Sequence, residues 1–136
     1  MTEGAFELRA IGRVESPIAS RDAAARQADE GAPAAWLSFA AWAAPALEGL
    51  AVGDEILVLT WLHLADRGVL RVHPRGDPRN PVSGVFATRS PDRPNPIGVH
   101  RTTIRRIDGL RIEVAALEAV DGTPIADVKP VLGSGA

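Results

Sequence analysis

The stretch from Gly84 to Gly98, GVFATRSPDRPNPIG, constrains the fold more strongly than any other part of the chain. Each of its three prolines fixes its own φ and disfavours the helical region for the residue before it. We therefore expect a short buried strand over residues 85–88 and then a stiff loop. Such a loop loses little further entropy when it binds a ligand. The polar side chains between the prolines are Arg89, Ser90, Asp92, Arg93 and Asn95. They predict a preorganised binding loop, although an ordinary surface loop has a similar composition.

Composition indicates one globular domain over residues 1–136, because 46% of residues are apolar and 24% are charged. The absence of cysteine excludes disulfides, thiolate metal sites and cysteine nucleophiles. No apolar run approaches the roughly 20 residues that span a bilayer. We expect a soluble, cytoplasmic protein.

Short β-rich runs separated by turns predict an all-β fold with one or two short helices, built as a barrel or a sandwich. Asp108-Gly109 is a strong hairpin signal, and Gly12 suggests a bulge or bend. The nearly continuous apolar run within residues 55–64 predicts a strand covered on both faces. Residues 18–35 are expected to be loop with a helical turn. The expected strands are 6–16, 36–42, 55–64, 69–72, 85–88, 99–107, 110–117 and 125–130, with helical turns at 45–50.

Charge is distributed unevenly along the chain, although the net charge is only −2. Residues 63–111 hold ten arginines against four aspartates, so the rest of the chain is acidic. This asymmetry favours a basic face for an anionic partner. A solvated strand face is the alternative.

Several common catalytic motifs are missing. The sequence contains no GxGxxG, no GxxxxGK[ST] and no GxSxG. His63, His73 and His100 lack the spacing of metal ligands, so we expect no metal site. This pattern is typical of a protein that positions a cofactor carrying the reactive group.

The ungapped run GVFATRSPDRPNPIG resembles the signature of the TsaA-like (TrmO) family of S-adenosylmethionine-dependent methyltransferases. The likeness covers most of residues 9–132 and implies the family's short form, without a C-terminal domain. Val131 stands where the family commonly has an aromatic residue. Further segments similar to the family are Ile11–Pro17, Arg26-Gln27, Trp61–His63, Val120–Pro124 and Asp127–Pro130.

This resemblance implies a single-sheeted β-barrel that forms a homodimer with S-adenosylmethionine near the subunit interface. It implies N6-methylation of threonylcarbamoyladenosine at position 37 of tRNA. The Arg89 guanidinium could clasp the carboxylate of the cofactor in a fork. The cofactor-binding residues implied in this way are Gln27, His63, Arg89, Val99, Asp121, Gly122, Thr123 and Pro124.

The acceptor nitrogen in such a reaction is a poor nucleophile, so a proton acceptor should matter. Asp127 is our first candidate for this catalytic role and His63 the second. The modified nucleotide or its phosphates would then be contacted by Arg93, Asn95 and Lys129. Each residue also has a structural interpretation: His63 at a strand rim, Asp121-Gly122 as a turn, and Asp127 with Lys129 facing solvent.

Two other functions remain open at this stage. Val131 and the acidic total charge favour a methyltransferase that acts on a small molecule. The third hypothesis is a β-barrel that binds a nucleotide or RNA without catalysis.

Overall fold

The structure, a computed structural model, describes residues 4–23 and 31–133. It is mostly β with short helices, which confirms the predicted fold class. The strands are β1 (Gly12–Glu15), β2 (Ala35–Phe39), β3 (Glu55–Trp61), β4 (Arg71–Val72), β5 (Ser83–Gly84), β6 (Ile97–Asp108), β7 (Arg111–Val114) and β8 (Pro124–Pro130). The 3-10 helices are η1 (Ala41–Leu47), η2 (Pro74–Gly76) and η3 (Val85–Ala87).

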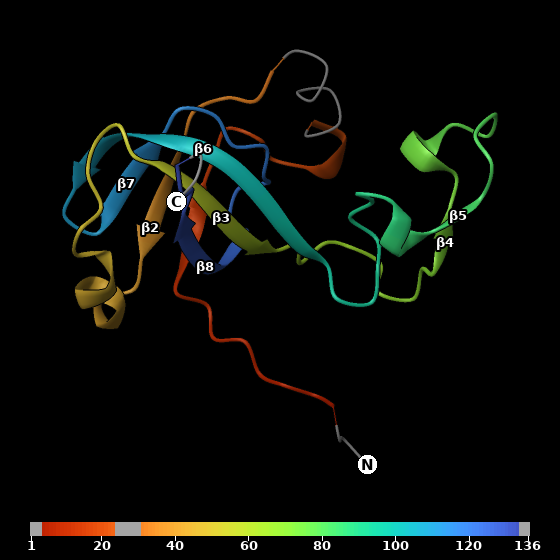
Figure 1. Ribbon diagram of the computed structural model, residues 1–136, viewed down its shortest axis with the longest axis horizontal. Coiled ribbons are helices and arrows are strands. Elements are labelled where there is room, and N and C mark those ends of the chain that lie inside the picture. The colour runs from red at the N-terminus through yellow and green to blue at the C-terminus, as the bar shows by residue number, and fades with distance from the viewer. Residues whose placement is uncertain (1–3, 24–30, 134–136) are drawn as a thin grey trace.

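Six strands form one antiparallel sheet in the order β1-β2-β7-β6-β3-β8 (Figure 1). Because β1 pairs with β8 as well as with β2, the sheet closes into a barrel. The long strand β6 pairs with β3 over its first half and with β7 over its second half. One end of β6 therefore belongs to the β3 side of the barrel, where the candidate site lies.

The barrel interior is filled by branched aliphatic side chains, as alternating strands with one inward face require. Burying each of them contributes about 1.5–3 kcal/mol. The most deeply buried of these side chains are Val14, Leu37, Ile56, Val58, Ile104, Ile112, Val114 and Ile125. This core holds β3, β6 and β8 in fixed register and so fixes the residues at their ends.

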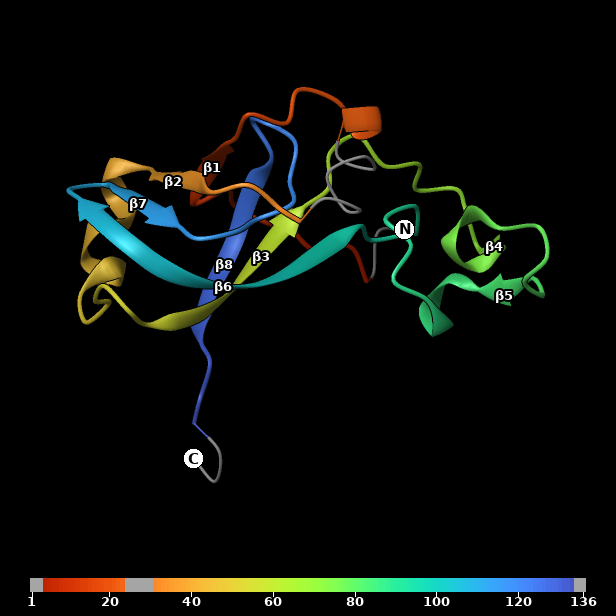
Figure 2. The same ribbon diagram turned by 90° about the horizontal axis from the view of Figure 1, so that it is seen from above.

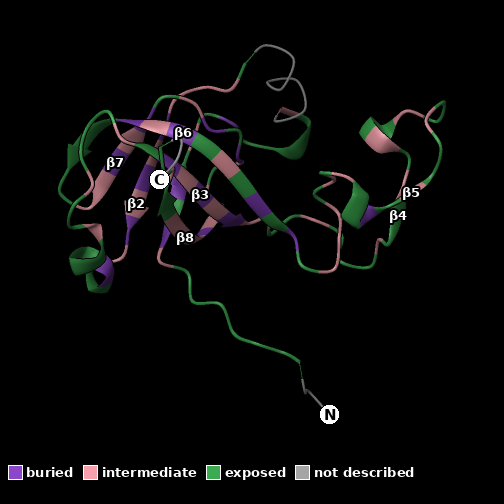
Figure 3. Cartoon of the chain, viewed as in Figure 1, coloured by how far each residue is buried: buried purple, intermediate pink, exposed green. Residues whose placement is uncertain are grey.

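Residues 69–88, which we call the arm, leave the barrel between β3 and β6 (Figures 1 and 2). The arm is a two-stranded ribbon, β4 paired with β5, flanked by η2 and η3. Most of its residues are exposed, in contrast to the barrel strands (Figure 3). The arm returns to the barrel through residues 89–96, the proline-rich loop.

The predicted buried strand at residues 85–88 is wrong. Residues 85–87 form the short helix η3, in which Val85 is buried and Phe86 is 82% exposed. The Val85 carbonyl accepts hydrogen bonds from Thr88 N at 3.0 Å, Thr88 Oγ1 at 2.9 Å and Arg93 Nη2 at 2.8 Å. An oxygen with three local donors closes a turn rather than joining a ladder.

The predicted first strand, residues 6–16, is shorter than expected. Only Gly12–Glu15 forms β1, while Phe6 is 89% exposed. Ile11, just before β1, still bonds to the chain on both sides: its N–H donates to the Ile125 carbonyl, and its carbonyl accepts from Ala40 N. Gly12 is not a bulge; a Cβ there would lie 2.4 Å from the Ser38 carbonyl oxygen. Glycine allows β1 and β2 to approach closely.

Two further strand details also differ from expectation. The predicted strand at 55–64 ends at Trp61 and alternates between buried and half-buried residues, because only one face points into the closed barrel. The predicted hairpin is present, but Asp108 pairs with Arg111, so the two loop residues are Gly109 and Leu110. Gly109 has a φ of 59°, which glycine adopts without strain. None of the helices in the described ranges is long and apolar enough to cross a bilayer.

Candidate functional site

An open cleft of about 1010 Å³ lies where the barrel meets the proline-rich loop. Its walls come from the end of β3, the start of β6, the proline-rich loop and the segment before β8. The residues that matter for its chemistry are Arg21, His63, Arg75, Arg89, Arg93, Gly98, Val99, His100, Glu118 and Thr123. Four arginines against one glutamate make the cleft basic, so it suits a ligand with an anionic group.

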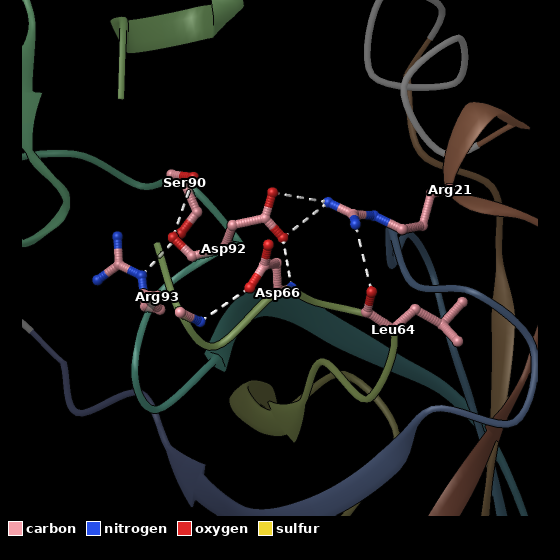
Figure 4. Close-up of polar contacts among 7 residues, drawn as sticks. Arg21, Leu64, Asp66, Ser90, Asp92 and Arg93 are labelled. Carbon is pink, nitrogen blue, oxygen red and sulfur yellow. Dashed lines mark hydrogen bonds and ion pairs between the residues drawn. The ribbon is translucent and has the colours of Figure 1, made fainter. Parts of the chain in front are cut away.

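The proline-rich loop is tied to its surroundings by Asp92 (Figure 4). The Asp92 carboxylate accepts two hydrogen bonds from Arg21 Nη2, at 3.0 and 3.2 Å, and one from Asp66 N at 2.8 Å. Arg21 also donates to the Leu64 carbonyl at 3.2 Å. We call Arg21, Leu64, Asp66 and Asp92 the clasp. It joins three segments that are distant in sequence, and Arg21 and Leu64 both line the cleft.

Arg93 stabilises the same loop from within. Its guanidinium donates to the carbonyls of Ser90 at 2.7 Å, Val85 at 2.8 Å and Thr88 at 2.6 Å. Arg93, which the sequence assigned to ligand contact, thus has partners within residues 85–90. Asn95, assigned to the same role, also has a protein partner, since its Oδ1 accepts from Arg67 Nη2 at 3.2 Å. These bonds account for the stiffness that the prolines predicted.

The floor of the cleft is formed by Gly98 and His100, and Thr60 packs beneath them. Thr60 lies opposite Gly98 in the β3–β6 register and is fully buried. Its Oγ1 is 2.8 Å from His100 Nε2. A Cβ on Gly98 would lie 2.4 Å from Thr60 Oγ1 and 2.9 Å from His100 Nε2. Glycine is therefore required by close packing at this position rather than by its φ angle.

His100 is a site residue that our sequence reasoning missed. Burial, together with the nearby Arg89 charge, lowers the pKa of His100 from 6.5 to about 4, so the ring is neutral at neutral pH. The period-two pattern of a strand puts residue 100 on the same face as Gly98. This alternation could have identified His100 from the sequence, because Gly98 was already assigned to the signature loop.

Glu118 is the second residue that was missed. It lines the cleft, and burial raises the pKa of its carboxyl group above the ordinary value. The side chains of its neighbours Leu117 and Ala119 are buried in the core, on the other side of the backbone. It is the one carboxylate among the described residues that line this cleft.

The structure brings together some of the predicted cofactor residues and separates others. His63, Arg89, Val99 and Thr123 all line the cleft. Gln27 lies outside the described residues.

Asp121 and Gly122 instead line a second depression of about 580 Å³, beside β1 and β2. The Asp121 carboxylate accepts from Ser16 N at 3.0 Å, and the Gly122 carbonyl accepts from Arg13 at 3.2 Å. Pro124 begins β8 and pairs with Arg13. The turn at Asp121-Gly122 thus holds β1 and the residues after it against the start of β8, which is the structural interpretation of this turn.

Asp127 and Lys129 lie on β8, outside the set of residues that line the cleft. Their side chains pair with each other at 3.0 Å, and both are at least half exposed. The Asp127 carboxylate also accepts from Val128 N at 2.9 Å. Of the two predicted proton acceptors, only His63 therefore faces the cleft. No three His, Asp or Glu side chains gather as metal ligands within residues 4–23 and 31–133.

The fold and site define a class: a small closed β-sheet protein whose basic cleft is built around a proline-rich loop. Residues 13–134 match the family model described as the tRNA-methyltransferase O N-terminal domain. The chain belongs to this family, in agreement with the resemblance noted in the sequence.

Relatives and solved structures give the same family. The chain is 51% identical over 87 residues to a probable S-adenosyl-L-methionine-binding protein of Methanocaldococcus jannaschii, covering 61% of this chain and 69% of that protein. It is 38% identical over 130 residues to a protein of the same description from Methanothermobacter thermautotrophicus, covering 96% of this chain and 93% of the relative.

The tRNA (adenine(37)-N6)-methyltransferase of Escherichia coli is 33% identical over 136 residues, which cover 93% of this chain. The crystal structure of TrmO from Pseudomonas aeruginosa superposes with a TM-score of 0.72 at 27% identity, covering 94% of this chain. This chain spans 58% of the E. coli enzyme and 56% of the P. aeruginosa chain.

Proposed function

We propose that this protein is an S-adenosylmethionine-dependent methyltransferase that methylates N6 of threonylcarbamoyladenosine at position 37 of tRNA. The observation that carries the proposal is the basic cleft beside the signature loop, in a chain that belongs to the tRNA-methyltransferase O family. Relatives of nearly the same extent are described as S-adenosyl-L-methionine-binding proteins, and a longer one as the tRNA enzyme.

The chemistry of the cleft fits this cofactor. S-adenosylmethionine carries a carboxylate, and Arg89 offers a guanidinium fork beside the Gly98 floor. Arg89 is exposed, and its contact with the Val99 carbonyl is long, at 3.5 Å, so the fork is available to a ligand. The neutral His100 ring, in contact with buried Thr60, adds a polar but uncharged surface below it. When bound, the cofactor supplies the electrophilic methyl group.

The protein contributes by positioning the reactants and by holding the proline-rich loop in place. The clasp and the Arg93 contacts hold the loop in one conformation before a ligand arrives. Such preorganisation lowers the entropy cost of aligning two reacting groups. His63, at the exposed end of β3, is the cleft residue that we assign to accept the proton from the nucleophile.

Methyl transfer to tRNA tests this function directly. Purified protein is incubated with unlabelled S-adenosylmethionine and tRNA that carries threonylcarbamoyladenosine, and nucleosides are analysed by mass spectrometry. We expect a gain of 14 mass units, one methylene, on that nucleoside alone. Product on unmodified tRNA, or none on either tRNA, would contradict the proposal.

Assembly as a homodimer is part of the proposal. The arm and the start of β6 expose Leu70, Val82, Phe86, Ile97 and Val99, each at least 43% accessible. Apolar side chains concentrated beside a ligand cleft are typical of an interface. We expect Phe86→Asp to shift the mass measured by light scattering from dimer to monomer, whereas Phe6→Asp leaves it unchanged.

A small-molecule acceptor is the second candidate. Val131 supplies no aromatic surface for stacking a base, and the net charge of −2 gives tRNA no general attraction. Methyl transfer to a component of a metabolite extract, with none to tRNA, would favour this candidate. Cofactor binding without any transfer would favour the non-enzymatic binding protein.

A further inference from the structure

We infer that Glu118 recognises positive charge on the ligand of the cleft and thereby selects a cationic ligand. The inference rests on the proposed function, because S-adenosylmethionine carries an ammonium group and a sulfonium. It adds the group that would pair with one of these two positive charges.

The position of Glu118 is fixed by the backbone on both sides. Leu117 N donates to the Pro33 carbonyl at 2.9 Å, and Ala119 N donates to the Leu117 carbonyl at 3.2 Å. The side chains of Leu117 and Ala119 are 1% and 3% exposed. Because these neighbours fill the core, the Glu118 side chain is turned outward, into the cleft.

The carboxylate has no partner that neutralises it in the described part of the chain. Burial alone raises the pKa of Glu118, with no contribution from a charged group or a hydrogen bond. Two arginines of the cleft have other partners: Arg21 pairs with Asp92, and Arg93 donates to the carbonyls of Ser90 and Val85. Glu118 is exposed, so its carboxylate, which has no partner among the described residues, is open to the cleft and gains from a ligand that brings a cation.

The remaining charges of the cleft make this role specific. Arg21, Arg75, Arg89 and Arg93 suit the anionic part of a ligand but repel its cationic part. Glu118 supplies the single negative charge among the described lining residues. Together with Arg89 it gives the cleft one group for each end of a zwitterion.

Calorimetric titration tests the inference on the wild type, Glu118→Gln and Glu48→Gln. Glu48 is an exposed glutamate at the end of η1, away from the cleft, so its variant controls for the change in net charge. We expect Glu118→Gln to weaken binding of S-adenosylmethionine about tenfold, the low end for a charge-assisted hydrogen bond. Glu48→Gln should leave it unchanged.

S-adenosylhomocysteine identifies the charge that is recognised, since it keeps the ammonium and lacks the sulfonium. An equal loss for both ligands in Glu118→Gln assigns the contact to the ammonium, and a loss confined to S-adenosylmethionine assigns it to the sulfonium. Affinity in the wild type should also fall as the pH drops through the pKa of Glu118, and this slope should vanish in Glu118→Gln. Unchanged affinity of Glu118→Gln for both ligands would overturn the inference, whereas absence of binding to the wild type would overturn the proposed function.

Discussion

Replacing Gly98 with alanine tests the packing at the floor of the cleft. The new Cβ would lie 2.4 Å from Thr60 Oγ1, 2.9 Å from His100 Nε2 and 3.1 Å from Leu62 Cδ2. His100 and Leu62 can rotate, but Thr60 is fully buried and β-branched, so its rotamer has little freedom. Its backbone is directly paired with that of Gly98. The strands must separate, or Thr60 must give up its contact with His100.

Overpacking of this kind costs about 1–3 kcal/mol, and we expect the upper part of that range. Urea unfolding should show this loss of unfolding free energy in Gly98→Ala with an unchanged slope. Gly84→Ala is the matched control, because the nearest atom to its Cβ is 4.0 Å away and its φ is −63°. Combining Gly98→Ala with Thr60→Ala should cost less than the sum of the two changes, since the second removes the clash. A Gly98→Ala protein as stable as the wild type would refute this account of the cleft floor.

Three further changes test the groups around the cleft. In His100→Gln, the unfolding free energy should lose a pH dependence. Below pH 6.5 the unfolded wild type binds a proton that folded His100 accepts only near pH 4, so the unfolding free energy of the wild type falls by up to roughly 3 kcal/mol across that window. The variant should show no such fall. Unfolding measured at pH 7 and pH 4.5 checks this, and equal losses in the two proteins would contradict it. Asp92→Asn should lower the unfolding free energy by about 1 kcal/mol, a small value because the ion pair with Arg21 is partly exposed. A double-mutant cycle with Arg21→Ala should show that the two changes are coupled. Arg93→Ala should weaken cofactor binding as well as stability, because the carbonyls of Val85, Thr88 and Ser90 lose their donor. Calorimetry that finds full affinity would contradict this positioning role.

Local backbone chemistry made much of the fold predictable. The prolines of residues 91–96 indicated a stiff loop, and Asp108-Gly109 located a hairpin to within one residue. The strand expected at 85–88 failed because its apolar residues matched a strand, while the decisive bonds to the Val85 carbonyl come from Thr88 and Arg93 further along the chain. The pattern of apolar residues does not reveal these donors, three and eight residues along the chain, which close a turn.

The site was less predictable because its partners are distant in sequence. The arginine excess of residues 63–111 indicated a basic face, yet Arg101 pairs with Glu55, Arg106 with Glu113 and Arg111 with Glu15. All three glutamates lie outside that stretch: Glu55 and Glu113 are on strands paired with β6, and Glu15 is on β1, across β2 from Arg111. Counting charge along the sequence therefore overstated the field.

Arg89 and His63, both at the ends of recognisable segments, line the cleft, and their cofactor and proton-acceptor roles stay predictions. His100 and Glu118 needed the fold, because a strand partner and a buried loop turn these side chains toward the ligand space. Asp127 illustrates the reverse case: it stands in a recognisable segment, yet its strand face turns it toward Lys129.

Binding of S-adenosylmethionine to the wild type and to Arg89→Ala, measured by calorimetry, tests the central claim most directly. We expect saturable binding to the wild type and at least tenfold weaker binding to Arg89→Ala, because a charge-assisted contact to the carboxylate is lost. Equal affinity of the two proteins, or no binding to the wild type at millimolar cofactor, would contradict the assignment of the cleft.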